Sequence, residues 1–168
     1  GQYHTWKELG VNKDGHAIGH MAGQPAQEQY SVPIRKFHAQ RVAALAKRLD
    51  AIPEGNGTVL DNTLIVWMSD SGEEHHGFCG EWPMVLIGNL GGRLKTDGRF
   101  LQYPAWQERG DQIPGHRTIA NFYLALLHAV GDRRKQFGEQ GQSLKGTAQS
   151  GPLAEVLTEV DRYDAVEE

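Results

Sequence analysis

This chain of 168 residues has a single cysteine, no long apolar run and no excess of positive charge. The single cysteine, Cys79, excludes an internal disulfide and a zinc site built from cysteines. No apolar stretch approaches the roughly 20 residues that a helix needs to cross a bilayer, so we predict no membrane span. Lys and Arg number 17 against 21 Asp and Glu, a formal charge of −4, which argues against a nucleic-acid partner.

Glycine is abundant, at 21 residues, and predicts many turns. The length fits one domain, and we see no internal repeat. We therefore predict a single domain over residues 1–168, with a long surface loop at 132–152 and a solvated acidic tail at 161–168. The chain carries no visible leader, but it begins with Gly1 rather than Met, which we interpret as the scar of either cloning or processing, so that a leader could have stood upstream.

Two short apolar runs, Leu64–Met68 and Met84–Ile87, are typical of strands buried on both faces of a parallel sheet. The polar insert between them contains Asp70, Glu73, Glu74, His75, His76 and Cys79. Ligands of open α/β sheets bind beyond the carboxyl ends of the strands. We therefore expect an α/β fold, a mostly parallel sheet flanked by helices, with the insert at its functional edge.

Two helices flank these runs in our prediction. Residues Ser31–Ile52 carry an apolar stripe at helical spacing that includes His38, which we expect to be packed. Residues His116–Val130 form the second helix, with Thr118 as its cap and Gly131 as its stop. Its predicted core stripe is Ile119, Phe122, Tyr123, Leu126, Leu127 and Val130.

Several other residues are candidates for binding. His16 and His20 would share a face if helical, as a metal pair, but flanking glycines favour a loop in which both are solvated or bonded to backbone. His116 lies at a loop-to-helix junction, where side chains often face a site, whereas we assign His128 a structural role. The glycine-rich turn after Asn89 could present N–H groups to an anion, although a tight turn explains it equally.

The residues also resemble a known superfamily. TLIVWMSDSGE is similar to the strand and turn that read roughly TLVVFTSDHGE in sulfatases and other alkaline-phosphatase-like enzymes. EWPMVLIGNLGG resembles the strand that follows there, and HRTIANFYLALLHAVGD resembles a later helix. The resemblance implies the carboxy-terminal part of an alkaline-phosphatase-like domain, because such domains are about twice this long and carry their nucleophile near the amino end.

A closer resemblance is to the HXXSHH family of bacterial proteins of unknown function. GHAIGHM at residues 15–21 corresponds to its name motif. The stretches PEGNGTVLDNTLIVW, GGRLKTDGRFLQYP and GPL follow in the family's order. Gly19 and Met21 replace the motif's Ser and last His, and Ser71 stands where the sulfatase-like pattern has a metal-binding His.

These features support three hypotheses. The first is a sulfatase- or phosphatase-like domain with a degenerate or incomplete active site and a binding or scaffold role. The second is a metal-dependent hydrolase of phosphate or sulfate esters, because carboxylate and imidazole ligands suit Zn, Mn or Fe. Its candidate metal ligands are Asp70, His75, His76, His116, His16 and His20. In the third, Asp70 caps the next segment and the histidines bond to backbone.

The remaining expectations concern partners and location. We expect an anionic small molecule or a protein as partner, and a homodimer could form through an unpaired sheet edge. The resemblance implies a periplasmic or other extracytoplasmic location. Cys79 is a weaker candidate nucleophile, because the sequence shows no cation or helix N-terminus beside it to lower a thiol pKa.

Overall fold

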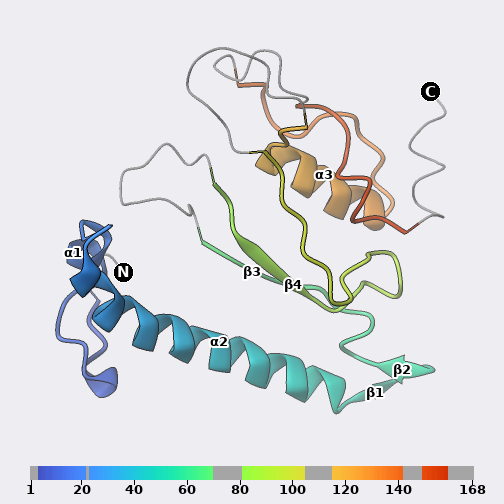
Figure 1. The fold of residues 1–168 in the computed structure, drawn as a ribbon. Coiled ribbons are helices and arrows are strands. Elements are labelled where there is room, and N and C mark those ends of the chain that lie inside the picture. Colours follow the sequence, from blue (N-terminus) through green and yellow to red (C-terminus); the bar gives the residue numbers. More distant parts are fainter. Residues whose placement is uncertain (1–3, 22, 70–80, 105–114, 142–148, 159–168) are drawn as a thin grey trace. The chain divides into compact units, whose positions relative to one another are not determined.

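The computed structural model describes residues 4–21, 23–69, 81–104, 115–141 and 149–158. Contacts divide the chain into two compact units, one of Gly1–Ala51 with Trp67–Val85 and the other of Ile52–Val66 with Leu86–Glu168. The elements are α1 (Gly15–Gly19), α2 (Glu28–Asp50), β1 (Pro53–Glu54), β2 (Gly57–Thr58), β3 (Ile65–Met68), β4 (Met84–Ile87) and α3 (Ile119–Ala129) (Figure 1).

The strands form two small sheets of two strands each, β1 with β2 and β3 with β4, and both sheets are antiparallel. The predicted α/β fold, a mostly parallel sheet flanked by helices as in alkaline phosphatases, is therefore wrong for the described residues. Both apolar runs do form strands, as predicted. Their continuous apolar character indicated burial but not direction, and two neighbouring strands pair antiparallel without needing a crossover.

The hairpin of β1 and β2 follows from its turn residues. Pro53 is paired with Thr58 and Glu54 with Gly57, which leaves a two-residue loop. The first loop residue, Gly55, has a φ of 59°, the sign that a type II′ turn requires at that position. The Asn62 amide donates to the Glu54 carboxylate over 2.6 Å and fastens the hairpin to the turn that follows it.

The amino-terminal unit has a small core of its own. Val11, Ile18 and Ile34 are buried together, and Trp6, Leu9 and Tyr30 pack against them. A bridge between Trp6 and Val11 closes a turn around the short 3-10 helix Lys7–Leu9. The first part of the chain therefore holds α1 against the start of α2 through apolar contacts rather than through a sheet.

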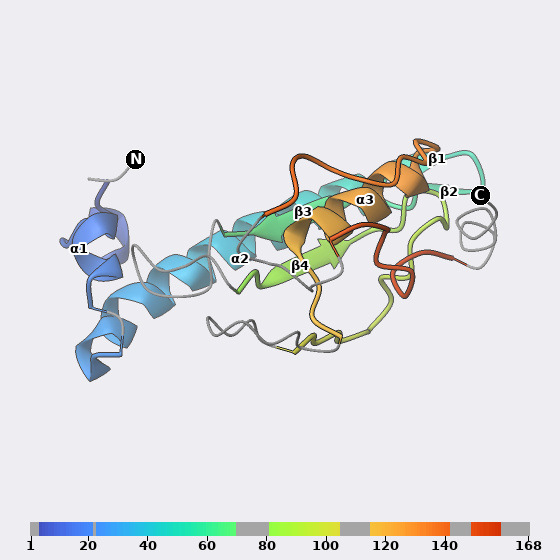
Figure 2. The ribbon, with the colours of Figure 1, turned by 90° about the horizontal axis from the view of Figure 1, so that it is seen from above.

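Helix α2 begins three residues before the predicted start. It continues through Pro33, and Figure 2 shows it as one uninterrupted helix. Proline removes one helical hydrogen bond, and this loss is tolerated here because Pro33 lies only six residues into a helix of 23. His38, which we predicted to be packed, is exposed; its ring meets the Trp6 ring edge-on and lies tilted against the Phe37 ring.

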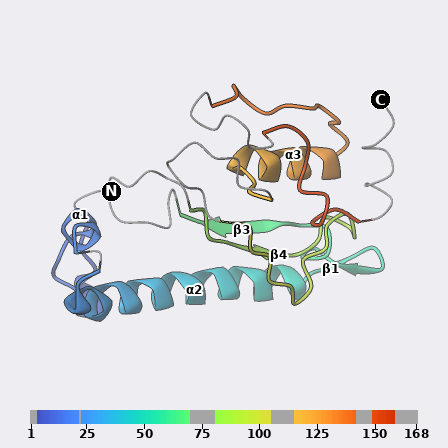
Figure 3. The same ribbon diagram turned by 45° about the horizontal axis from the view of Figure 1, so that its top comes forward.

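The other unit is organised around α3. Figure 3 shows the segment that ends at residue 158 running beside this helix. Leu94 and Leu157 form a bridge, and the Lys95 N–H donates to the Val156 carbonyl over 2.7 Å. The buried apolar residues of this unit are Leu94, Phe122, Leu124, Ala125, Ala129, Leu153, Val156 and Leu157. The core therefore forms between segments about 60 residues apart in the chain.

The buried face of α3 differs from the predicted stripe. The buried residues are Asn121, Phe122, Leu124, Ala125, His128 and Ala129. Val130, predicted to be in the core, is 63% exposed. The cap and the stop were predicted correctly, with Thr118 as the N-cap and Gly131 in the left-handed conformation at a φ of 94°, although the predicted range began three residues before Ile119. The predicted stripe was built from apolar residues alone, so it left out the buried polar residues Asn121 and His128.

Candidate functional site

The first site is the histidine pair on α1. The Asp14 carboxylate accepts a hydrogen bond from the Ala17 N–H over 2.9 Å and so starts a helix at Gly15. His20 closes this helix, and its N–H donates to the carbonyl of His16. The loop favoured from the flanking glycines is therefore replaced by a single helical turn, because the capping carboxylate outweighs the low helix propensity of glycine.

This turn brings the two imidazoles together. The Nε2 atoms of His16 and His20 lie 3.2 Å apart, and the ring centroids are separated by 4.7 Å at an angle of 74°. One imidazole donates its Nε2–H to the Nε2 of the other. Ile18, on the opposite side of the turn, is buried in the core of the unit. The same helix is therefore anchored by its apolar side chain and presents both rings together.

The spacing of the pair fits a shared metal ion. Two nitrogens bound to one tetrahedral zinc ion at 2.0–2.1 Å lie about 3.3 Å apart. The observed Nε2–Nε2 separation of 3.2 Å is close to that value. Metal binding would require the proton between the rings to move to Nδ1 or to leave, and both Nε2 lone pairs to turn toward the ion.

The acidic and imidazole-bearing insert stays a prediction. Asp70, His75, His76 and Cys79 lie outside the described residues. Within the described part of the chain, no three His, Cys, Asp or Glu side chains converge as a metal-binding group. The six candidate ligands are therefore represented in the described structure by the His16–His20 pair and by His116 alone.

His116 has a structural environment. It is 8% exposed, and its Nδ1 is 2.8 Å from the carbonyl oxygen of Pro104, to which it donates its ring N–H. Its backbone carbonyl accepts a hydrogen bond from the Arg117 guanidinium. The junction position predicted a side chain that faces a site, whereas the contact that the structure shows is a hydrogen bond to the backbone. This hydrogen bond connects the segment that precedes α3 to Pro104.

His128 also connects two segments. It is 4% exposed, and its Nε2 donates to the carbonyl of Arg134 over 2.9 Å. The Arg134 guanidinium in turn bonds Asp132, and this hydrogen bond lowers the pKa of the Asp132 carboxyl below its ordinary value. His128 therefore fastens the segment after α3, in agreement with the structural role assigned from sequence.

The glycine-rich turn after β4 uses its N–H groups internally. The Gly91 N–H donates to the Asp61 carbonyl over 2.7 Å, and the Gly92 N–H donates to the Asn89 side chain over 2.8 Å. A Cβ atom at Gly88, which has a φ of 87°, would overlap the carbonyl oxygens of Thr63 and Leu60. Gly88 therefore serves close backbone packing, whereas Gly91 and Gly92 adopt left-handed φ angles of 67° and 81°. The tight-turn interpretation describes this segment better than an anion site.

Tyr103 was not identified from the sequence. Its hydroxyl is buried and has no hydrogen-bond partner of good geometry among the described residues. Burial, followed by the negative charge of Glu155, raises the pKa of Tyr103 to about 12. The Arg99 guanidinium donates to the Glu155 carbonyl over 2.6 Å. A lone tyrosine in an irregular stretch gave no periodic signal from which this contact could have been predicted.

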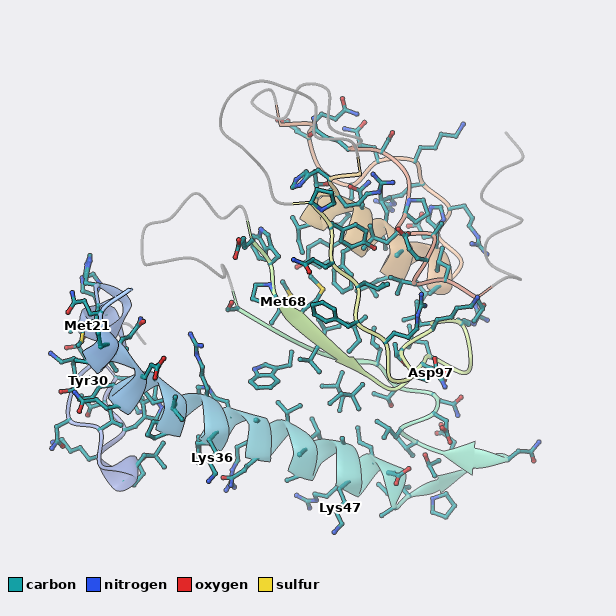
Figure 4. All side chains as sticks on the ribbon, in the orientation of Figure 1. Met21, Tyr30, Lys36, Lys47, Met68 and Asp97 are labelled. Carbon is teal, nitrogen blue, oxygen red and sulfur yellow. The ribbon has the colours of Figure 1, made fainter. Side chains whose placement is uncertain are left out.

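A pocket of about 500 Å³ in the amino-terminal unit was also missed. It is lined by Gly10, Asn12, Lys13, Asp14, Ala17 and Tyr30. Figure 4 shows Tyr30 in the first turns of α2. The run Asn-Lys-Asp-Gly at residues 12–15 is a turn signal, and it could have predicted an exposed turn that carries Lys13 and Asp14. Nothing in this run indicates that Tyr30 lies next to it.

Comparison of the chain with protein-family models, curated proteins and solved structures gave no match. The resemblance to HXXSHH proteins therefore stays a prediction based on the motifs quoted above. No helix in the described ranges is long and apolar enough to cross a membrane.

Proposed function

We propose that this chain is a metal-dependent binding module. Its amino-terminal unit holds one divalent transition metal between His16 and His20. The observation that carries the proposal is the 3.2 Å separation of the two Nε2 atoms, which matches the bite of two imidazoles on one zinc ion. Two neutral imidazoles favour zinc over hard cations such as magnesium or calcium, which prefer oxygen ligands.

Sequence departures support binding rather than catalysis. The motif resembling HXXSHH has Gly19 and Met21 in place of its Ser and its last His. Ser71 replaces the histidine of the sulfatase-like pattern. A chain that retains one histidine pair but has lost neighbouring ligands is better suited to bind than to activate a nucleophile. The extracytoplasmic location implied by the resemblance belongs to the same proposal.

The geometry also suggests how a partner would be bound. A zinc ion with four ligands would have two positions left after binding His16 and His20. An imidazole or carboxylate of a protein partner could occupy them, as could the same pair from a second copy of this chain. Metal-dependent association, including a homodimer, therefore follows from a site that supplies two of the four ligands.

The test is a zinc titration of the full chain after treatment with a chelator. We expect one metal per chain or, for a bridged dimer, one metal per two chains. Bound metal stabilises the folded state by RT ln(1 + [L]/Kd), about 2.7 kcal/mol at a free concentration of 100 Kd. Binding should weaken in acid, because imidazole binds a metal only when neutral. Sedimentation with and without zinc measures the oligomeric state.

Matched variants separate this site from nonspecific binding. His16→Ala and His20→Ala should each abolish the stabilisation by zinc, whereas His38→Ala, which changes an exposed histidine on α2, should leave it intact. Anomalous diffraction at the zinc edge should place the ion between the two Nε2 atoms. Zinc bound with equal affinity by the double variant would refute the proposal.

The clustering of Asp70, His75 and His76 in the sequence favours a second candidate, the metal-dependent hydrolase. The same zinc-loaded protein would then hydrolyse a phosphate or sulfate monoester, and Asp70→Ala would abolish the turnover while leaving zinc bound at His16 and His20. Turnover that vanished in the His16→Ala variant instead would assign the chemistry to the amino-terminal pair.

A further inference from the structure

The pocket of the amino-terminal unit carries one positive and one negative side chain. Lys13 and Asp14 are the charged residues among those lining it. They are neighbours in the chain, yet each has another contact. The Lys13 ammonium lies 5.7 Å from the centroid of the Tyr30 ring, and the Asp14 carboxylate accepts the Ala17 N–H through one oxygen, Oδ1. Two opposite charges therefore line the same pocket, and each is engaged with a different neighbour.

The rest of the pocket complements these charges. The ring of Tyr30 packs partly against the core of the unit, so its position is supported by Val11, Ile18 and Ile34. Asn12 adds an amide that can donate or accept a hydrogen bond. The volume, about 500 Å³, lies within the range of small-molecule sites. An aromatic face, an amide and two opposite charges thus line one opening.

We propose that this pocket binds a small zwitterion of the α-amino-acid class with an aromatic side chain. The ligand carboxylate pairs with the Lys13 ammonium, and the ligand ammonium pairs with the Asp14 carboxylate. The ligand side chain lies against the ring of Tyr30. An α-amino acid carries a carboxylate and an ammonium together, so a single ligand can offer one partner to each of the two charged side chains. Neither a simple anion nor a simple cation would satisfy both side chains.

The experiment is calorimetric titration of the chelator-treated full chain with L-phenylalanine. N-acetyl-L-phenylalanine, which lacks the ammonium, and L-phenylalaninamide, which lacks the carboxylate, are the matched probes. We expect each to bind about tenfold more weakly, because each loses one charge-assisted contact. Omitting metal separates this site from the zinc proposal, since an amino acid can itself chelate zinc.

Two variants remove one charge each. Asp14→Asn keeps a residue that caps helices well and so preserves α1, whereas Lys13→Gln keeps the length of the side chain. Each should weaken binding of L-phenylalanine about tenfold, while Glu8→Gln, an exposed change outside the pocket lining, should have no effect. Unchanged circular dichroism confirms folding. Equal binding of all three probes, or binding that survives both pocket variants, would overturn the inference.

Discussion

Replacing Asn121 tests the packing of the carboxy-terminal unit most directly. Its side chain is 1% exposed and makes four hydrogen bonds. The amide oxygen accepts the Thr118 N–H over 2.8 Å and the Thr118 hydroxyl over 2.9 Å. The amide nitrogen donates to the carbonyls of Ser150, over 3.1 Å, and Gly151, over 2.8 Å. One side chain therefore caps α3 and holds the 150–153 segment against it.

The cost of Asn121→Ala can be worked from these contacts. A buried hydrogen bond contributes about 0.5–1.5 kcal/mol net, and loss of a cap costs about 1 kcal/mol. Thr118 and Gly151 are half-buried and Ser150 is exposed, so water can replace part of what is lost. We expect destabilisation of about 3 kcal/mol, measured by urea denaturation and by faster hydrogen exchange in peptides covering α3 and residues 150–157.

Asn121→Asp provides the sharper measurement. It preserves size and the acceptor for Thr118, but it places a carboxylate oxygen against the Ser150 and Gly151 carbonyls. Burial and repulsion would raise the pKa of the new carboxyl in the folded state, so the loss of stability should be complete at neutral pH and should diminish on acidification. Gln102→Ala, which deletes an exposed amide, is the control. A cost for Asn121→Ala below about 1 kcal/mol, or an Asn121→Asp variant indifferent to pH, would refute this account.

Three further outcomes follow from the structure. Gly88→Ala should lower the free energy of unfolding by about 3 kcal/mol, because it combines a left-handed backbone with a steric overlap. Gly98→Ala, at a φ of 60° with open space around it, should lower it by about 1 kcal/mol in the same urea assay. Equal losses for the two variants would contradict the overlap. Tyr103→Phe should match or exceed the parent in stability at pH 7. Only the parent should then lose stability between about pH 10 and pH 12, because its raised pKa keeps the folded phenol neutral while the unfolded phenol ionises. If the stability of the parent and of Tyr103→Phe fell equally with pH in this range, the prediction would be wrong. Pro33→Ala should stabilise α2 by about 1–2 kcal/mol through the restored hydrogen bond, and a lower melting temperature would argue against this.

The parts of the fold that sequence reasoning predicted are those with local causes. The Thr118 cap and the Gly131 stop bounded α3, and the apolar runs placed β3 and β4 to within one residue. Strand direction was wrong, because a run of apolar residues carries no information about which neighbour it pairs with or in which sense. The α2 start was missed because a capping residue and Pro33 were taken as a boundary, although proline also fits early in a helix.

The candidate site divides in the same way. The i, i+4 spacing of His16 and His20 was visible in the sequence, but the helix that makes it effective depends on Asp14, whose capping role was overlooked. Asn121 is buried but was not among the predicted core residues, because the predicted stripe was read from apolar side chains alone. Tyr30 and the Lys13–Asp14 pair come together only through the core of the unit, and no local pattern predicts a contact of that kind.

The bridge between Leu94 and Leu157 has a consequence for synthesis of the chain. The amino-terminal core needs only residues up to Ile34, so it can collapse while the remainder is still being translated. The bridge, by contrast, closes a loop of about 60 residues, and such long-range closure is slow. The nascent chain would thus expose the apolar side of α3 until residue 157 has left the ribosome, and that interval is when a chaperone would be needed most.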